Sequence, residues 1–254
     1  MTTRTTEFDQ NHLDREDHWI AVSDLMAGLM IVFLLIAIVF MVQVEAEAVK
    51  IEAEADRAEA VTERISEIAV IYQELKHQLY EDLYDEFQED LPEWGAELDR
   101  DSLTVRFEDP DLLFEAGSSE LRPRFRQILD DFFPRYANIL NSDAYQQDIE
   151  EVRIEGHTSS DWRTTTSKED SYFLNMELSQ ARTRSTLRYI LSLPRVRDDL
   201  AWLRRHLTAN GLSFSRLILT ADNAEDPIAS RRVEFRVKTN AEEKIARIIE
   251  VSSE

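Results

Sequence analysis

Residues 19–42 read WIAVSDLMAGLMIVFLLIAIVFMV, and this apolar run decides how the chain is organised. From Leu25 to Val42 no residue is charged. At about 1.5 Å of rise per residue, a helix over the run can span a hydrocarbon core of about 30 Å. A signal peptide has a basic start and a shorter apolar core, whereas residues 1–18 are polar and slightly acidic. We therefore expect an uncleaved, single-pass transmembrane helix over residues 19–44, preceded by a short tail.

One carboxylate, Asp24, lies near the start of this run. An ionisable group inside a bilayer costs a few kcal/mol, so such residues are usually functional. Trp19 is typical of the membrane interface, and Asp24 lies more than one helical turn beyond it. The alternative is a capping or headgroup-level residue at the bilayer edge. Gly28 lies one turn further on the same face and would let a partner helix approach closely. Because a single helix cannot shield the charge of Asp24, a second membrane protein is expected.

The composition excludes several kinds of partner. The chain has 254 residues, with 51 acidic and 29 basic side chains and a net charge of -22. Nucleic acid and anionic lipid headgroups require basic surfaces, so neither is expected to bind. The absence of cysteine excludes a disulfide framework and a thiolate metal site. The basic residues that flank the apolar run are too evenly balanced to predict its orientation.

Residues 45–98 are predicted to form a helical linker. This stretch is rich in Ala and Glu and has no Gly or Pro before Pro92. Apolar or aromatic residues recur every seven positions at Ile51, Ala58, Ile65, Tyr72 and Leu79. A second set, three residues after members of the first, consists of Val61, Ile68 and Leu75. The pattern predicts a rod of about 60–70 Å. It is short for a coiled coil, so pairing with a second helix and packing against its own domain both stay open.

Beyond Pro92 and Gly95 the pattern alternates between strands and helices. Strands are predicted over residues 102–107, 151–156, 216–220 and 232–239, helices over 124–140 and 177–193, and a helical insert over 195–208. This alternation predicts a mixed sheet covered by helices, assigned to residues 99–239, with a charged tail over 240–254. The expected fold class is α+β: a transmembrane helix, a long helical linker and a C-terminal α/β sandwich.

Four short motifs carry a resemblance to a known family. They are FEAGSSEL at 114–121, IEGHT at 154–158, NMELSQAR at 175–182 and SRRVE at 230–234. In order and spacing they resemble the OmpA-like peptidoglycan-binding domain shared by OmpA, the lipoprotein Pal and the flagellar stator subunit MotB. The resemblance covers residues 102–238. It implies a pocket for the diaminopimelate carboxylates of the cell-wall peptide.

The same resemblance implies the residues of this pocket. Arg182 ends the LSxxR motif, and a guanidinium fork suits bidentate binding of a carboxylate. Where the family has an Asp after GHT, this chain has Ser159, so the Ser160 hydroxyl or the Asp161 carboxylate is a candidate replacement. Arg231 and Arg232 are expected to be structural. The expected peptidoglycan-binding residues are His157, Thr158, Ser159, Asp161, Asn175, Leu178 and Arg182.

No enzymatic or metal site is expected. His157, Ser159, Ser160 and Asp161 share one loop, which cannot easily align a nucleophile, a base and an orienting residue, and the chain has no GxSxG motif. A zinc site from His157 and His206 would lack further ligands. We therefore expect no catalytic residue and no cofactor.

The apolar run resembles the ion-carrying helix of MotB-type stator subunits, which implies that Asp24 carries the transported ion, H⁺ or alternatively Na⁺. The long rod and the acidity are more similar to the stator family of Zorya anti-phage systems than to flagellar stators. That resemblance implies a ZorA-like polytopic membrane partner and a homodimer of this chain among about five partner chains. It also implies an inner-membrane location, with a cytoplasmic N-terminus and a periplasmic C-terminal domain. A flagellar stator subunit and a passive wall tether without ion conduction are the alternatives.

Overall fold

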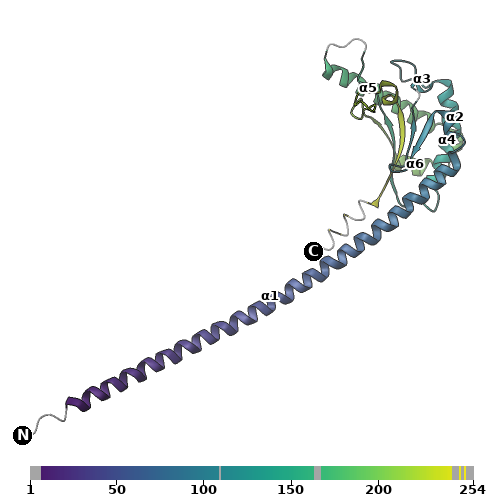
Figure 1. The fold of residues 1–254 in the computed structure, drawn as a ribbon. Helices are drawn as coiled ribbons and strands as arrows, with labels where there is room; N and C mark the ends of the chain where they lie inside the picture. The colour runs from purple at the N-terminus through teal and green to yellow at the C-terminus, as the bar shows by residue number, and fades with distance from the viewer. Residues whose placement is uncertain (1–6, 109, 163–166, 242–245, 247–248, 250–254) are drawn as a thin grey trace, which may run out of the picture. The chain divides into compact units, whose positions relative to one another are not determined.

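The computed structural model describes residues 7–108, 110–162, 167–241, 246 and 249 (Figure 1). The chain divides into two compact units, residues 1–63 and 64–254, which are described separately here. The first helix, α1 (Glu7–Phe87), begins in the first unit and ends in the second. The tail predicted after residue 240 lies largely outside the described residues.

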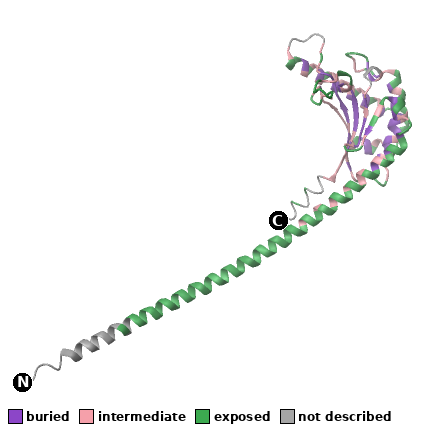
Figure 2. Cartoon of the chain, in the orientation of Figure 1, coloured by how far each residue is buried: buried purple, intermediate pink, exposed green. Residues whose placement is uncertain are grey.

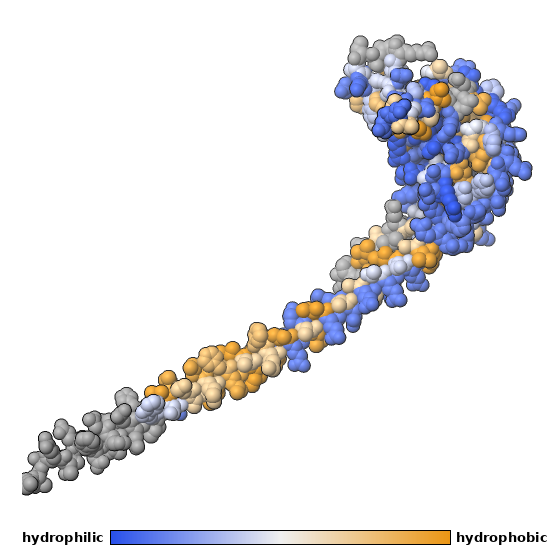
Figure 3. All heavy atoms as spheres, in the orientation of Figure 1, coloured by the Kyte–Doolittle hydropathy of each residue, from blue (hydrophilic) through white to orange (hydrophobic). Residues whose placement is uncertain are grey.

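The described residues of the first unit form the N-terminal part of α1. Its apolar residues form a continuous exposed stretch, green in Figure 2 and orange in Figure 3. From Val22 onward, α1 is long and apolar enough to cross a membrane by length and composition. Exposed apolar side chains over this length have no protein core to cover them. The chain thus has the long N-terminal apolar helix that the sequence predicts, which suits a membrane anchor.

The second unit is built on a five-stranded mixed sheet with the strand order β1-β2-β5-β3-β4. The strands are β1 (Ala96–Asp99), β2 (Thr104–Phe107), β3 (Ile149–Gly156), β4 (Leu207–Gly211) and β5 (Val233–Thr239). β3 and β4 are parallel, and the other neighbouring pairs are antiparallel. This arrangement confirms the predicted mixed sheet.

Helices α4 (Pro123–Leu140) and α5 (Lys168–Ile190) pack on one face of this sheet. The centre of the core is aromatic: the ring of Phe132 lies 5.3 Å from that of Phe107 on β2 and 5.2 Å from that of Phe235 on β5. Side chains alternate along a strand, so Phe235 faces the core while its neighbours on β5 face the other side. Shorter helices complete the unit: α2 (Leu91–Trp94), α3 (Pro110–Leu113), the 3₁₀ helix η1 (Pro194–Val196), α6 (Leu200–His206) and α7 (Pro227–Ser230).

The last turns of α1 belong to this second unit. Leu79, Leu83 and Phe87 are fully buried, and the ring of Phe87 lies 5.2 Å from that of Phe132. Arg135 on α4 fixes the helix end through Glu86, at 2.6 Å between Nε and Oε1. At this end of the predicted rod, the seven-residue pattern therefore serves packing against its own domain. β1 also lies in the segment that the sequence assigned to the linker.

After α5 one predicted strand is wrong and one strand was not predicted, whereas η1 and α6 confirm the predicted helical insert. The predicted strand over 216–220 is a loop segment: the backbone N–H of Ile218 donates to Ser230 Oγ at 2.9 Å, and only one isolated bridge forms, between Leu219 and Glu225. The actual strand is β4, which begins where α6 ends, inside the predicted helical insert. A short apolar run imitates a strand, whereas β4 reads LTANG and lacks clear alternation. The helices predicted over 124–140 and 177–193 and the other three strands are confirmed, with α5 beginning earlier, at Lys168.

Candidate functional site

Three predicted site residues directly follow β3 and are buried. His157, Thr158 and Ser159 are 2%, 3% and 4% exposed. The backbone N–H of His157 donates to the carbonyl of Arg232 at 3.0 Å, and that of Thr158 donates to the carbonyl of Ser213 at 2.9 Å. The segment is therefore held between the start of β5 and the loop that follows β4.

Helix α5 supplies the second side of the site. Asn175 is 2% exposed, and its amide nitrogen lies 3.4 Å from Ser171 Oγ. The Ser171 hydroxyl in turn donates to the carbonyl of Ser160 at 3.0 Å. This chain of contacts connects Asn175 with the loop after β3. Leu178 is half-buried on the same helix.

Two glycines allow α5 to lie close to the strands. A Cβ on Gly211 would lie 2.3 Å from the backbone nitrogen of Gln180, and a Cβ on Gly156 would lie 2.7 Å from Thr183 Cγ2. The Gln180 side chain closes the contact, because its Oε1 accepts from the Gly211 N–H at 2.8 Å. Only glycine permits this approach, which brings the site residues of α5 next to the loops of the sheet.

Arg182 is anchored by the loop that contains the FEAGSSEL motif. Its Nε donates to the carbonyl of Ser118 at 2.9 Å and a terminal nitrogen donates to that of Glu115 at 3.3 Å, while the guanidinium lies over the Phe114 ring at 4.9 Å. Burial, and secondarily the charge of Arg231, lower the pKa of Arg182 to about 10. The side chain is thus still positive at neutral pH. Within the described residues, no carboxylate forms an ion pair with it, so its charge is uncompensated.

A carboxylate that the sequence did not predict reaches the loop after β3. Glu225, in the loop between β4 and α7, accepts from the backbone N–H of Ser160 at 2.8 Å and from the Ser160 hydroxyl. Asp161, predicted as a replacement for the family Asp, is exposed. Because 65 positions separate Ser160 from Glu225 in the sequence, no local pattern could reveal the contact.

The imidazole of His157 lies in a network of paired charges. Its Nε2 lies 3.6 Å from Glu234 and 3.8 Å from Glu155. Burial is the main cause that lowers the pKa of His157, and Arg232 adds to it against the opposing effect of both carboxylates. The ring is therefore neutral at pH 7.

The two carboxylates and His157 are close enough together to hold a metal ion, with ligand atoms within 4.8 Å of one another. Each carboxylate is already paired with arginine: Glu234 with Arg232 at 2.6 Å and Arg106 at 2.9 Å, and Glu155 with Arg216 at 3.1 Å. A cation would have to compete with three guanidinium groups. The arrangement therefore favours a structural ion-pair network, and it gives Arg232 the structural role that the sequence predicts.

Asp24 lies in the first unit, far in sequence from this site. It is exposed on α1, four residues before Gly28, so both residues lie on one helical face. A Cβ on Gly28 would meet nothing within 4 Å. The face next to Asp24 is therefore open to a neighbouring helix.

The amino-acid sequence is similar to a known protein family and to a Zorya protein. The sequence model of the OmpA family matches residues 113–199. The Zorya protein ZorB of Escherichia coli is 47% identical over 234 residues, which cover 92% of this chain and 93% of that protein.

Among solved structures, the chain is similar to a MotB-like protein from Desulfovibrio vulgaris, with 23% identity, 65% of this chain and 95% of that chain covered, and a TM-score of 0.46. The cell wall anchor of the T6SS from Pseudomonas aeruginosa is also similar, with 23% identity, coverage of 62% and 96%, and a TM-score of 0.42.

Proposed function

The chain belongs to the family of the Zorya protein ZorB, and we propose that it is the wall-binding and ion-carrying subunit of a stator-like motor that acts in anti-phage defence. The OmpA-type domain would hold the complex on peptidoglycan, and Asp24 would carry the ion through the membrane. No catalytic step is part of this function.

The observation that carries the wall-binding half is the uncompensated charge of Arg182. Two of its N–H groups are used by backbone carbonyls, and the described residues supply no acid. A carboxylate of the wall peptide would provide the missing negative charge through a charge-assisted hydrogen bond. The Thr158 hydroxyl is buried and has no hydrogen-bond partner among the described residues, so it is a further candidate for contact with the ligand.

Glu225 is a candidate replacement for the Asp that the family has at the position of Ser159. Because Ser160 donates two hydrogen bonds to Glu225, a carboxylate from the loop between β4 and α7 lies next to the loop where the family places its Asp. In this proposal Glu225, rather than Asp161, contributes the negative charge of the pocket. The pocket would then recognise a ligand that carries both a carboxylate and an ammonium group.

The membrane half of the proposal depends on Asp24. A single helix cannot shield a carboxylate from lipid, so Asp24 requires a partner that completes a polar path. We assign this role to a ZorA-like polytopic membrane protein around a homodimer of this chain. The ion would be H⁺, with Na⁺ as the alternative. The N-terminus would lie in the cytoplasm and the second unit in the periplasm of the inner membrane.

Wall binding is tested by retention of the purified full chain on isolated cell-wall sacculi. Arg182→Ala should reduce retention by roughly tenfold to a hundredfold, since a hydrogen bond to a charged group contributes about 1.5–3 kcal/mol. Arg184→Ala, two positions away and exposed, is the matched control and should bind as the wild type does. Undiminished retention of Arg182→Ala would refute this role.

A further inference from the structure

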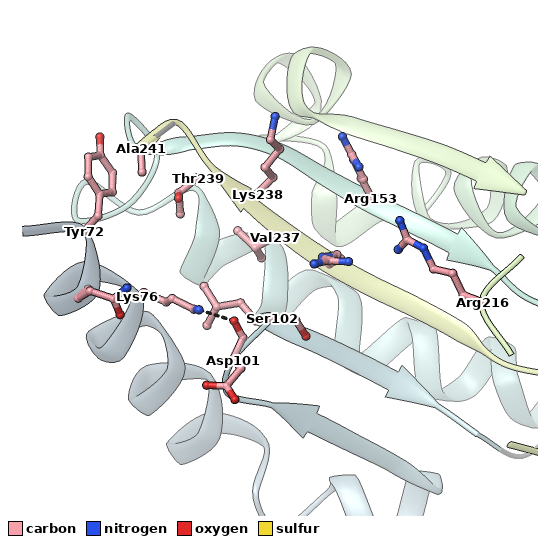
Figure 4. A pocket seen from close by; sticks show the side chains of 13 residues that line it. Tyr72, Lys76, Asp101, Ser102, Arg153, Arg216, Val237, Lys238, Thr239 and Ala241 are labelled. Atoms are coloured by element: carbon pink, nitrogen blue, oxygen red, sulfur yellow. Dashed lines mark hydrogen bonds between the residues drawn. The ribbon is translucent and has the colours of Figure 1, made fainter. Parts of the chain in front are cut away.

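A second site candidate lies on the face of the sheet that α4 and α5 leave uncovered. On β5, Val233, Phe235 and Val237 are buried in the core, so the residues between them face the other side. A hollow of about 440 Å³ lies over this face, bordered by α1. Its charged and polar lining includes Tyr72, Lys76, Arg153, Arg216, Arg236 and Lys238 (Figure 4). These residues do not overlap with those around Arg182.

Two arginines stand directly opposite each other in this hollow. In the antiparallel register of β3 and β5, Arg153 pairs with Arg236. Like charges directly opposite on neighbouring strands repel each other and destabilise a sheet. Arg153 has an internal partner, Glu151, at 2.6 Å. The side chain of Arg236 forms no hydrogen bond or ion pair within the described part of the chain.

The other cations of the hollow are satisfied from within. Lys238 pairs with Glu150 at 2.8 Å and Arg216 with Glu155 at 3.1 Å, while Lys76 donates to the carbonyl of Asp101. The carboxylate of Asp101 also lines the hollow. The hollow thus has a small excess of positive charge, at Arg236. Such a site suits one or two carboxylates, whereas a polyphosphate would meet the surrounding acids.

The shape of the hollow favours an extended chain. Figure 4 shows Tyr72 and Thr239 at one end and Arg216 at the other. A volume of about 440 Å³ lies within the usual range for ligand pockets and can hold a few peptide residues. We propose that this groove binds an acidic peptide segment of a partner protein, with one of its carboxylates on Arg236.

The test uses the full chain in detergent micelles and a fluorescein-labelled pentapeptide, GEGEG, whose binding is measured by anisotropy at low salt. The wild type should bind GEGEG, Arg236→Gln should weaken binding at least tenfold, and Arg184→Gln should leave it unchanged. The net charge of -22 repels an acidic peptide elsewhere, which keeps nonspecific binding low.

Three results of the binding measurement itself would overturn the proposal. They are no binding of GEGEG to the wild type, equal binding to Arg236→Gln, or equal binding of the neutral peptide GQGQG. Sodium acetate is also tested as a competitor, at the same carboxylate concentration as unlabelled GEGEG. Complete displacement of labelled GEGEG by acetate would show that a free carboxylate suffices and would refute a peptide segment as the occupant.

Thermal unfolding provides an independent readout. Because Arg236→Gln relieves the repulsion with Arg153, its melting temperature without peptide should be no lower than that of the wild type. A clear decrease would assign Arg236 a structural role and would also overturn the proposal.

Discussion

Arg182 and Arg232 show how differently one residue type is used within one domain. Arg232 is 6% exposed and donates to Glu234 at 2.6 Å, so its charge is neutralised inside the protein. Arg182 donates to carbonyls and has no acid partner among the described residues. A neutralised arginine stabilises the fold, whereas an uncompensated one can attract an anion from outside. For this reason Arg182 is the residue on which wall binding should depend.

The lowered pKa of His157 predicts how the free energy of unfolding depends on pH. Burial lowers its pKa in the folded chain, while in the unfolded chain its pKa is the ordinary value near 6.5. Below that value the unfolded state binds more protons, so the free energy of unfolding falls as the pH falls. The loss between pH 7 and pH 5 should be up to about 2 kcal/mol and should be smaller in His157→Gln.

The free energy of unfolding of the wild type and of His157→Gln is measured at pH 7 and pH 5, with unfolding monitored by near-ultraviolet circular dichroism. The window isolates His157 from Glu234, because the lowered pKa of Glu234 affects stability only near and below the ordinary carboxyl value. His77→Gln is the control, since His77 is exposed on α1. An equal decrease in His157→Gln and the wild type would contradict the assignment.

At the scale of elements, the end of α1 is part of the domain rather than a spacer. Leu79, Leu83, Phe87, Leu91 and Trp94 all join the hydrophobic core ahead of β1. The spacing of Tyr72, Leu75 and Leu79 could be read from the sequence. The same spacing is expected for a helix that pairs with a second copy of the chain and for one that packs against its own domain. The aromatic side chains of α4 favour packing of α1 against its own domain, and local periodicity does not reveal this surface.

This packing predicts where the chain can be cut. A fragment of residues 64–254 should fold, because it keeps every buried residue at the end of α1. A fragment of residues 99–254 loses six core side chains, Leu98 among them, and all of β1 except Asp99. At about 1.5–3 kcal/mol for each, the loss is on the order of 10 kcal/mol, comparable to the whole stability of a typical domain. Circular dichroism and thermal melting check both fragments. Cooperative melting of residues 99–254 at the temperature of residues 64–254 would contradict the role of α1.

At the scale of the whole molecule, the sequence predicts what local patterns encode. The apolar run, the helices over 124–140 and 177–193, and the strands at 102–107, 151–156 and 232–239 all follow from composition and periodicity. The contacts between Glu225 and Ser160 and between Arg153 and Arg236 depend on tertiary pairing and sheet register, so they could not be predicted. The net charge of -22 likewise hides the local basic groove around Arg236.

The two sites of the proposed function lie in different units of the chain. Asp24 lies in one unit and Arg182 in the other, and α1 runs through both units as one helix. In the proposed function, ion transfer at Asp24 would drive a partner only if the chain is held still, and the proposed wall contact would hold it. A passive tether would need Arg182 but not Asp24.

The most direct test is therefore the level of phage protection in cells in which Asp24→Asn replaces the wild-type chain. Membrane levels and recovery of the ZorA-like partner must be equal, and Asp56→Asn, on the exposed part of α1, is the control. Asparagine keeps the shape of the side chain but cannot bind and release a proton, so we predict loss of protection with assembly intact. Full protection by Asp24→Asn would contradict the ion-carrying role and leave a passive wall tether.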